Sequence, residues 1–281
     1  MALIPPFFLD CVVAIGRMGN DGNKQWIGTG FLLGRPYLSD QGNGHYHVFL
    51  VTNKHVLAEK NSVIVRFNPQ EDESARDYEI PLRDQSAKVL WSGHPDAELD
   101  IAVIQLNPNI LYKHKVRFNY FAADQHMLTM PHMARMGVSE GDYIYVLGFP
   151  MGIVAPDRQY TVARSGIIAR FRDTIEGQSK DFLVDVSIFP GNSGGPVITK
   201  PEMISVDGTQ AVDKAALIGM ITSYVPYKDV AISQRTQRPR VVFEENSGLA
   251  AAVPSDFILQ AIDHCLATKA TATVYQQGEQ I

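Results

Sequence analysis

The sequence predicts an all-β protein, built as a sandwich or a barrel, that ends in one α-helix. Short runs rich in β-branched and aromatic residues recur at spacings of roughly 8–12 residues, with glycine, proline, asparagine or aspartate between them. In Trp26–Gly34, glycines stand where a barrel corner or a close backbone contact would need them. Near the C-terminus, Pro254-Ser255-Asp256 opens an amphipathic stretch, which predicts a helix over Asp256–Leu266 with Ser255 as its N-cap.

The expected strands fall into two groups, separated by a segment of different character. The first group is Cys11–Arg17, Trp26–Gly34, His45–Thr52, Ser62–Phe67, Tyr78–Leu82, Ala87–Trp91 and Ile101–Leu106. The second group is Asp142–Gly148, Gln159–Arg170, Phe182–Ile188, Pro196–Thr199, Leu217–Tyr224 and Gly248–Val253. The segment between the groups is rich in Met, His and Tyr and alternates poorly, which indicates a connection with a short helix near Pro131–Met136.

These groups predict the organisation of the chain. We expect an N-terminal lobe over residues 1–106, a connection over 107–141, a C-terminal lobe over 142–253, and a helix with a polar tail over 254–281. Lys200–Lys214 and Pro226–Asn246 are expected to be polar, exposed loops. In the second loop, Arg235, Arg238 and Arg240 are interpreted as a solvated charge cluster, with a docking patch as the alternative.

The composition narrows the class of protein. Of the 281 residues, 45% are apolar and 20% are charged, which is ordinary for a soluble globular chain with one large or two small all-β domains. The formal net charge of −5, without a basic stripe, argues against a nucleic-acid partner. The only cysteines, Cys11 and Cys265, are expected to be reduced and buried, with a disulfide between them as the alternative.

The first ten residues carry no recognisable export or membrane signal. They are apolar, but no Lys or Arg precedes the apolar run, and Pro5, Pro6 and Asp10 interrupt it. No other run approaches the length that spans a bilayer. These features predict a cytoplasmic protein without a membrane partner, or a periplasmic or secreted one if a signal was removed.

The functional prediction depends on the stretch from Phe189 to Val197. It reads Phe-Pro-Gly-Asn-Ser-Gly-Gly-Pro-Val and places the hydroxyl of Ser193 among three glycines and between two prolines. Glycine adopts backbone angles that other residues resist, and proline fixes φ. One interpretation is a surface turn, since these residue types are common there. The other is an unusual turn whose N–H groups point at one spot beside the hydroxyl.

A base and an acid that could activate this serine stand earlier in the chain. A serine hydroxyl needs a base to become a nucleophile, and histidine titrates near neutrality. Of eight histidines, His55 follows an apolar strand and Thr52-Asn53 directly, which fixes its backbone at a strand end. Asp100 immediately precedes the apolar strand Ile101–Leu106, where burying a carboxylate is costly unless it has a partner. The alternative for Asp100 is a strand end that faces solvent.

In the order His55, Asp100, Ser193, these segments resemble the trypsin-like (chymotrypsin-fold) serine protease family. The resemblance is closer to its bacterial Deg/HtrA-like branch, without the PDZ domain that often follows there, and covers roughly residues 10–266. Further resembling segments are Gly28–Leu33, Gly141–Pro150, Thr161–Ile168, Leu217–Ser223 and Gly248–Ser255. The resemblance implies two six-stranded antiparallel β-barrels, a C-terminal α-helix, and a catalytic cleft between the barrels.

The resemblance also implies a serine endopeptidase that acts through an acyl-enzyme intermediate without a cofactor or a metal. Ser193 would be the nucleophile, His55 the base and acid, and Asp100 the group that orients His55. The backbone N–H groups of Gly191 and Ser193 would form the oxyanion hole. The implied partner is a polypeptide substrate, and a regulatory partner or a homo-oligomer stays open. The alternative function is a latent protease-fold protein that binds or senses a partner.

The resemblance places four residues at the substrate. Ser187 would lie at the base of the pocket for the residue before the cut, where it lacks the carboxylate that selects Lys or Arg. Tyr224 stands where members with open pockets have glycine, so a small or medium apolar residue is expected in the pocket. The substrate main chain would pair with the edge formed by Thr222, Ser223 and Tyr224.

Two further features bear on regulation and on metals. Asn192 stands where many animal digestive members carry an aspartate that pairs with a newly released N-terminal amine. Asn192 cannot form that ion pair, so activation by N-terminal cleavage is not expected, whereas loop ordering often controls activity in the Deg-like branch. His45 and His47 would share one face of a strand, which is compatible with a metal site, but further ligands are not visible.

Overall fold

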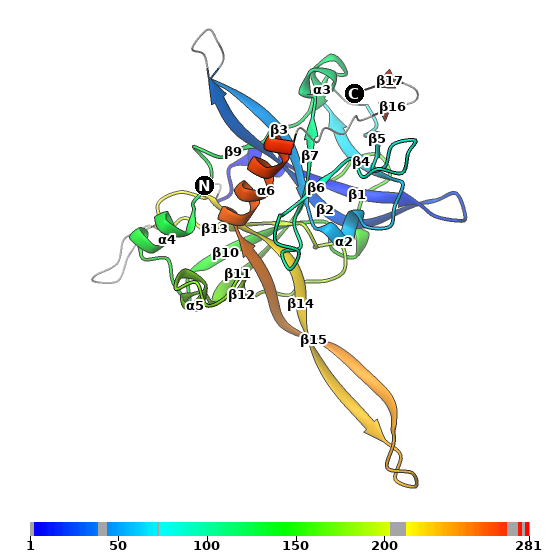
Figure 1. Cartoon of the computed structure of the whole chain (residues 1–281), viewed down its shortest axis with the longest axis vertical. Coiled ribbons are helices and arrows are strands. Elements are labelled where there is room, and N and C mark those ends of the chain that lie inside the picture. Colours follow the sequence, from blue (N-terminus) through cyan, green and yellow to red (C-terminus); the bar gives the residue numbers. More distant parts are fainter. Residues whose placement is uncertain are drawn as a thin grey trace.

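The regular structure of the described chain is mainly β and is arranged in two lobes (Figure 1). The structure is a computed structural model that describes residues 3–38, 44–71, 73–202, 212–268, 275–276 and 279–280. From the N-terminus to residue 122, the elements are α1 (Pro6–Leu9), β1 (Val12–Met18), β2 (Lys24–Leu38), β3 (Gly44–Thr52), α2 (Lys54–Leu57), β4 (Ser62–Pro69), β5 (Arg76–Pro81), β6 (Ser92–Gly93), β7 (Ala102–Leu106), α3 (Pro108–Lys113), β8 (Val116–Arg117) and β9 (Phe121–Ala122).

The elements of the second lobe and the C-terminal segment follow. They are α4 (Met130–Met136), β10 (Tyr143–Gly148), the 3₁₀-helix η1 (Pro150–Gly152), β11 (Val162–Arg170), α5 (Arg172–Ile175), β12 (Phe182–Asp185), β13 (Pro196–Thr199), β14 (Leu217–Ile232), β15 (Pro239–Pro254), α6 (Ser255–Thr268), β16 (Tyr275–Gln276) and β17 (Glu279–Gln280). Helix α4 lies where the sequence predicts a short helix in the connection.

The first lobe is a curled sheet around an apolar core. Its strands follow the order β17-β16-β5-β4-β1-β2-β3-β7-β6, while β8 pairs with β4 and β9 with β2. The buried side chains of its core include Val13, Leu32, Leu50, Val65 and Ile104. The path does not close on itself, so this lobe is an open, curled version of the six-stranded barrel that the resemblance implies.

The second lobe is a closed barrel. Its six strands follow the order β10-β11-β12-β15-β14-β13, and every neighbouring pair is antiparallel. Inward-facing residues fill its interior, among them Ile144, Val146, Phe182, Val184 and Ile218. The prediction of an all-β protein of chymotrypsin type with a C-terminal helix is therefore confirmed.

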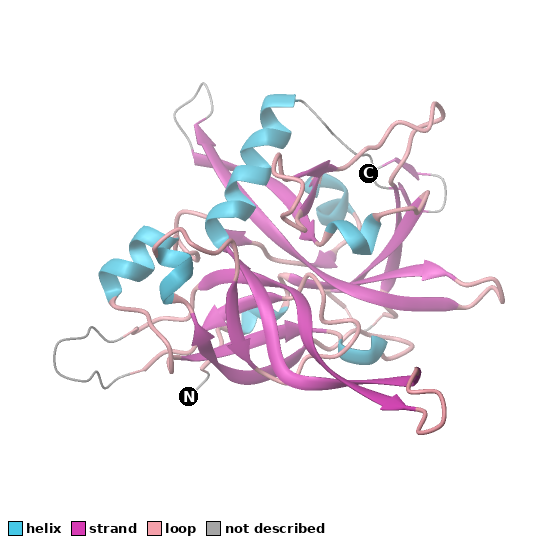
Figure 2. Cartoon of the chain, turned by 60° about the horizontal axis from the view of Figure 1, so that its bottom comes forward, coloured by secondary structure: helices cyan, strands magenta, loops and turns pink. Residues whose placement is uncertain are grey.

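Helix α6 packs against both lobes (Figure 2). It contacts β6 and β7 of the first lobe and β14 and β15 of the second. Ser255 is the first residue of the helix rather than the N-cap before it, and its Oγ donates to the Leu128 carbonyl (2.5 Å). Cys11 and Cys265 are both buried in the apolar cluster that the helix completes, and both are free thiols.

Strands β14 and β15 continue far beyond the barrel as a two-stranded ribbon (Figure 1). Their pairing extends from Pro226 opposite Asn246 to Ile232 opposite Pro239. The prediction of a loop over Pro226–Asn246 was therefore wrong, because its β-branched and aromatic residues form a regular ladder below a polar tip. Of the other expected loop, Lys200–Lys214, residues 203–211 lie outside the described part of the chain.

A loop of the second lobe, residues 149–161, is bound to the first lobe. Arg66 on β4 is buried and donates to the carbonyl groups of Ala155 and Pro156 (2.8 and 3.1 Å). Its guanidinium also forms two hydrogen bonds with Asp77 (2.6 and 2.8 Å). Burial raises the pKa of Asp77, but Arg66 and Lys24 more than offset this effect, so the pKa lies below its ordinary value.

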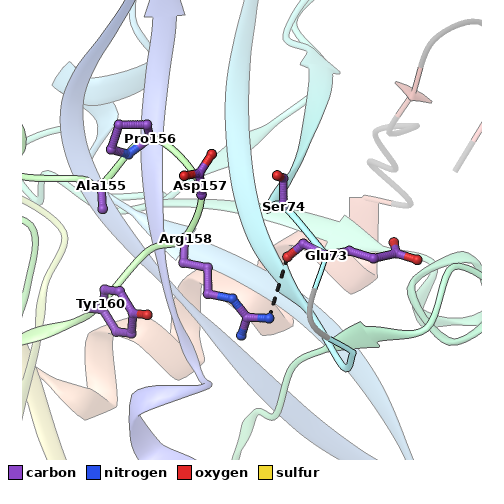
Figure 3. A pocket seen from close by; sticks show the side chains of 7 residues that line it. All are labelled: Glu73, Ser74, Ala155, Pro156, Asp157, Arg158 and Tyr160. Carbon is purple, nitrogen blue, oxygen red and sulfur yellow. Dashed lines mark hydrogen bonds between the residues drawn. The ribbon is translucent and has the colours of Figure 1, made fainter.

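The loop also forms one wall of an open pocket of about 360 Å³ (Figure 3). Glu73 and Ser74 of the first lobe line it on one side, and residues 155–158 and Tyr160 line it on the other. Arg158 spans the pocket and donates to the carbonyl of Glu73 (3.5 Å). None of the predicted catalytic residues lines this pocket.

Candidate active site

The end of β3 and the start of β7 bring His55 and Asp100 together. The two strands are antiparallel neighbours, with Thr52 opposite Ala102. His55 lies on the single turn α2 after β3, and Asp100 lies two residues before the start of β7. Nδ1 of His55 is 2.5 Å from Oδ2 of Asp100, and the backbone N–H of His55 donates to Oδ1 (3.1 Å). One carboxylate thus holds both the ring and the backbone of the histidine.

The surroundings of Asp100 stabilise its charged form. Its backbone carbonyl accepts a hydrogen bond from Nδ2 of the buried Asn53 (2.7 Å). Its side chain is 31% exposed and that of His55 is 52% exposed, so the carboxylate is partly open to solvent rather than fully buried. Burial raises the pKa of Asp100, but the hydrogen bonds and the charge of His55 lower it by more than burial raises it, so the net shift is downward.

Two lysines fix the loop that leads to Asp100. Lys54, beside His55, donates from Nζ to three carbonyl groups of residues 94–97 at 3.4–3.5 Å. Lys180 of the second lobe pairs with the carboxylates of Asp96 and Glu98 (2.5 and 2.6 Å). The loop before Asp100 is therefore tied to both lobes.

Every carbonyl group from Phe189 to Ser193 accepts a hydrogen bond. The donors are Asn192 N to Phe189 O (3.0 Å), Met151 N to Pro190 O (2.6 Å), Thr29 Oγ1 to Gly191 O (2.6 Å), Gly195 N to Asn192 O (2.8 Å) and Thr29 N to Ser193 O (2.9 Å). The N–H groups of Gly191 and Ser193, in contrast, donate to no described residue. The five carbonyl groups of the loop thus all have donors, whereas the N–H groups of Gly191 and Ser193 have no acceptor in the described chain.

The turn around Gly191 determines where its N–H points. Phe189 to Asn192 form a hydrogen-bonded turn with Pro190 and Gly191 in the middle, and Gly191 has φ +99°. Proline followed by a residue with positive φ is typical of a type II turn. A trans peptide directs its C=O and N–H oppositely. Because Pro190 O faces Met151, the N–H of Gly191 faces away from Met151.

Thr29 joins the two lobes at this loop. It is fully buried on β2, and in addition to its bonds to Gly191 and Ser193, its Oγ1 accepts the N–H of Phe149 (3.0 Å). Gly194, with φ +84°, lies so close that a Cβ there would overlap the Thr29 carbonyl oxygen. Sequence reasoning missed Thr29, although its place between Gly28 and Gly30 is a signal of close backbone approach.

Gly28 lies against both Ser193 and Val56, the residue after His55, but Ser193 and His55 are not hydrogen-bonded. A Cβ on Gly28 would lie 2.9 Å from Cγ1 of Val56, the residue after His55, and 3.5 Å from the Ser193 carbonyl oxygen. Within the described chain, no hydrogen bond joins Ser193 Oγ to the His55 ring. The structure thus forms the His55–Asp100 link and leaves the Ser193–His55 link open.

The three predicted edge residues lie on β14 directly after its contact with the Ser193 loop. Ile221 exchanges backbone hydrogen bonds with Gly194 and Gly195 (3.0 and 2.9 Å). Thr222 follows and donates from Oγ1 to the Ala251 carbonyl (3.2 Å), and Ser223 is exposed. The edge therefore starts beside the predicted nucleophile.

Ser187 and Tyr224 have different surroundings. Ser187 is exposed on the extended segment after β12, between the buried Val186 and Ile188. Tyr224 is partly buried against the core of the second lobe, and its hydroxyl donates to Glu244 (2.7 Å). This hydrogen bond, together with the charge of Glu244, raises the pKa of Tyr224. Both side chains are uncharged at neutral pH.

Asn192 is completely buried behind the turn. Its Oδ1 accepts the N–H of Phe189 (3.3 Å), and its Nδ2 has no hydrogen-bond partner within the described chain. An amide at this position stabilises the turn without the counter-ion that a buried carboxylate requires.

The His45–His47 pattern is occupied by other contacts. The ring of His47 stacks on Tyr37 with centroids 4.1 Å apart, and its Nδ1 lies 3.3 Å from Nε2 of Gln105. Among the residues that the structure describes, no group of three or more His, Cys, Asp or Glu side chains could hold a metal ion. Over the same residues, no helix combines the length and apolarity needed to cross a membrane.

A family model for the trypsin-like peptidase domain matches residues 28–202, a range that contains His55, Asp100 and Ser193. The chain belongs to this family. Among related trypsin-like proteins, a probable periplasmic serine endoprotease, DegP-like, from Hahella chejuensis (strain KCTC 2396) is 24% identical over 236 residues. The match covers 83% of this chain and 40% of that relative, so the chain spans well under half of the relative's length. The Deg/HtrA-like resemblance agrees with this relative.

A solved structure with some likeness is the MamO protease domain from Magnetospirillum magneticum in its apo form. It is 14% identical, and the alignment covers 90% of this chain and 96% of that chain with a TM-score of 0.46. A likeness at this level carries no structural argument.

The lowered pKa of Asp100 predicts how its contribution to stability depends on pH. A carboxyl group whose pKa is lowered on folding stabilises the folded protein fully when the pH is above the pKa of the unfolded state. This stabilisation is lost as the pH falls through the pKa of the folded state. We expect Asp100→Asn to unfold more easily than the wild type at neutral pH, and the difference to shrink as the pH falls below 3.8. Urea unfolding at several pH values measures this difference.

Asp10 provides a control of opposite sign. Burial raises the pKa of Asp10, so its charge opposes folding at neutral pH. Asp10→Asn should therefore not reproduce the loss expected for Asp100→Asn. A difference between Asp100→Asn and wild type that is independent of pH would contradict the prediction.

Proposed function

We propose that this chain is a serine endopeptidase that hydrolyses peptide bonds with Ser193, His55 and Asp100 as its triad. The observation that carries the proposal is the pair of N–H groups, of Gly191 and Ser193, left without acceptors beside a serine in a loop whose carbonyl groups are all bonded. The hydrogen-bonded His55–Asp100 pair and membership of the trypsin-like family support it.

In the proposed mechanism, Ser193 Oγ attacks the peptide carbonyl carbon while His55 Nε2 accepts its proton. Asp100 accepts Nδ1–H of His55, which leaves Nε2 as the basic nitrogen and stabilises the imidazolium. The carbonyl oxygen becomes an oxyanion and accepts hydrogen bonds from the N–H groups of Gly191 and Ser193. His55 then protonates the leaving amine, and a water molecule hydrolyses the acyl-enzyme by the same steps. No cofactor or metal takes part.

A second candidate function rests on the open link between Ser193 and His55. In this alternative, the chain is a latent protease-fold protein that senses or binds a partner and becomes active only when the partner completes the link. Catalytic hydrogen bonds are often long in substrate-free enzymes and tighten when the substrate binds, so we favour the active endopeptidase.

The proposed partner is a polypeptide, with a regulatory partner or a homo-oligomer as part of the second candidate. Because Asn192 is uncharged and already bonded within its turn, we propose that no N-terminal cleavage is needed for activity. A cytoplasmic location stays a prediction, whereas the DegP-like relative is named as periplasmic.

Labelling with a fluorophosphonate probe tests the nucleophile. The wild type should react, whereas Ser193→Ala and His55→Ala should not, because phosphonylation needs both the hydroxyl and the base that removes its proton. Ser86→Ala, in an exposed turn of the first lobe, should label like the wild type. Wild type that labels only after a partner is added would favour the latent protein, and wild type that never labels would contradict both functions.

The uncharged Ser187 and the partly buried Tyr224 lead us to propose a pocket for small or medium apolar residues. Cleavage of a peptide library should therefore occur mainly after Ala, Val or Leu, since a cation in the pocket would lose its hydration without gaining a carboxylate. Mass spectrometry of the products identifies the residue before the cut. Efficient cleavage after Lys or Arg would overturn this preference.

Thr29 should act as a positioning residue for the oxyanion hole. Thr29→Val keeps the shape but removes the hydroxyl that holds the Gly191 carbonyl, so we expect kcat to fall at least about tenfold with KM little changed. Thr29→Ser keeps a hydroxyl and should restore most of kcat. Steady-state kinetics on one peptide substrate measures both constants.

Thr199→Val is a matched control for this substitution. Thr199 is also buried, its Oγ1 donates to the Lys214 carbonyl (3.2 Å), and it accepts the N–H of Ala216 (2.9 Å). Thr199→Val should lower the free energy of unfolding without lowering kcat. Equal effects of Thr29→Val and Thr199→Val on kcat would show that Thr29 has only a structural role.

A further inference from the structure

The ribbon formed by residues 226–246, which we call the arm, exposes an unusual amount of apolar surface. It extends away from the barrel (Figure 1), and its six large apolar side chains are 41–59% exposed: Tyr227, Val230, Ile232, Val241, Val242 and Phe243. A two-stranded ribbon is at best marginally stable on its own, and clustered exposed apolar side chains indicate a binding surface.

One edge of the arm continues the edge proposed to hold the substrate. β14 pairs with β13 only as far as Met220, and Ile221 then bonds to the Ser193 loop. From Thr222 to Ile232, β15 pairs with one edge of β14, and no strand of the described chain pairs with the other. A row of backbone groups that no strand pairs therefore runs from beside Ser193 along the arm, interrupted only where Pro226 lacks an N–H and where the N–H of Val230 donates to Oδ1 of Asp229 (2.7 Å).

The direction of the substrate along this edge follows from the site. The residues before the cut are proposed to pair with Thr222–Tyr224, and the end of this stretch next to Ile221 touches the Ser193 loop. Residues further before the cut must therefore lie beyond Tyr224, alongside the arm. At about 3.3 Å per residue, the free edge up to Ile232 accommodates roughly ten substrate residues.

The tip of the arm is cationic. Arg235 and Arg238 lie in the tip, and Arg240 lies at the start of its second strand. The side chains of these three arginines form no ion pair or hydrogen bond within the described chain. Lower on the arm, Glu244 is bonded to Tyr224 and lies 3.5 Å from Lys228. The acidic residues of the arm, Asp229, Glu244 and Glu245, all lie below the tip, and only Glu244 is in an ion pair within the described chain, so the charge at the tip itself is positive.

We propose that the arm binds an extended polypeptide substrate by adding it as a strand along the free edge of β14. The apolar side chains of the arm contact the bound segment, and the three arginines bind an acidic stretch about 10–14 residues before the cut. This inference rests on the proposed endopeptidase function and defines its substrate class: extended polypeptides with acidic residues well before the cleaved bond.

Two fluorescent peptides test the charge preference by binding alone. They share the same residues around the cut and a 14-residue N-terminal extension, which carries four Glu or four Lys about 10–14 residues before the cut. Anisotropy titration on Ser193→Ala should show that the Glu peptide binds at least about fivefold more tightly, as three surface ion pairs allow. Equal affinities would overturn the inference.

Charge reversal locates the preference on the arm. In Ser193→Ala, adding Arg235→Glu, Arg238→Glu and Arg240→Glu should abolish or invert the ratio of the two affinities. The same number of reversals at the exposed Arg117, Arg135 and Arg172 changes the net charge equally and should leave the ratio intact. Loss of the ratio in both triple variants would overturn the assignment to the arm.

Two further readouts separate the proposals. Moving the four Glu residues to within four positions of the cut should abolish the preference, because that segment lies beside Thr222–Tyr224 rather than beside the tip.

If wild type cleaves neither peptide but Ser193→Ala still distinguishes them, the endopeptidase proposal fails and the arm inference stands. Cleavage of both peptides with no difference in affinity overturns the arm inference alone. A dimer that the arm variant no longer forms, together with equal affinities for the two peptides, would show that the arm binds a second copy of the chain. This outcome also overturns the arm inference.

Discussion

The arrangement of the site depends on the hydrogen bonds that Thr29 makes across the boundary between the lobes. Thr29 belongs to a long strand of the first lobe, yet its N–H and hydroxyl bond to the carbonyl groups of Ser193 and Gly191 in the second. These carbonyl groups would otherwise be free to turn toward the position proposed for the oxyanion. Because a rigid strand supplies the donors, the loop is ordered before any substrate binds, which is the condition for electrostatic preorganisation. The site therefore exists only where the two lobes are correctly packed.

The lobes contribute different parts of this chemistry for reasons of sheet geometry. His55 and Asp100 are neighbours because Thr52 and Ala102 face each other on adjacent antiparallel strands, so that the end of one strand meets the start of the next. The loop of Ser193 is instead held by hydrogen bonds from Met151 and Ile221 of its own lobe and from Thr29 of the other. The proposed base is held by one sheet and the proposed nucleophile between two lobes, so no single element sets the distance between them, which fits the open link.

Much of the fold and of the candidate site could be predicted from local sequence, and two of the exceptions, Thr29 and Ser255, share one physical cause. The strands around His55 and Asp100 and the helix α6 follow from apolar periodicity and residue type. Thr29 could not be assigned a role, because its partner Gly191 lies 162 residues away and the contact arises only from packing. Ser255 has the sequence of an N-cap, but it is the first residue of the helix and its hydroxyl donates to the Leu128 carbonyl, 127 residues away, a contact that arises only from packing. The arm does not have the sequence pattern of a half-buried strand, because it is exposed on both faces: apolar residues stand next to one another in Val230–Ile232 and Val241–Phe243 instead of alternating with polar ones.

Strand β14 shows how one element can serve the core and the substrate. Its residues are buried from Leu217 to Ile221, where neighbours cover both edges, half-exposed beside Ser193, and exposed along the arm. Its pairing with β15 shifts register between Ile221 and Ser223 and again between Tyr224 and Pro226. Such irregularities bend a strand and re-aim its side chains. The barrel core thus fixes where the proposed substrate edge begins, and the two shifts determine how it leaves the barrel, so the arm is positioned by the same packing that holds Ser193.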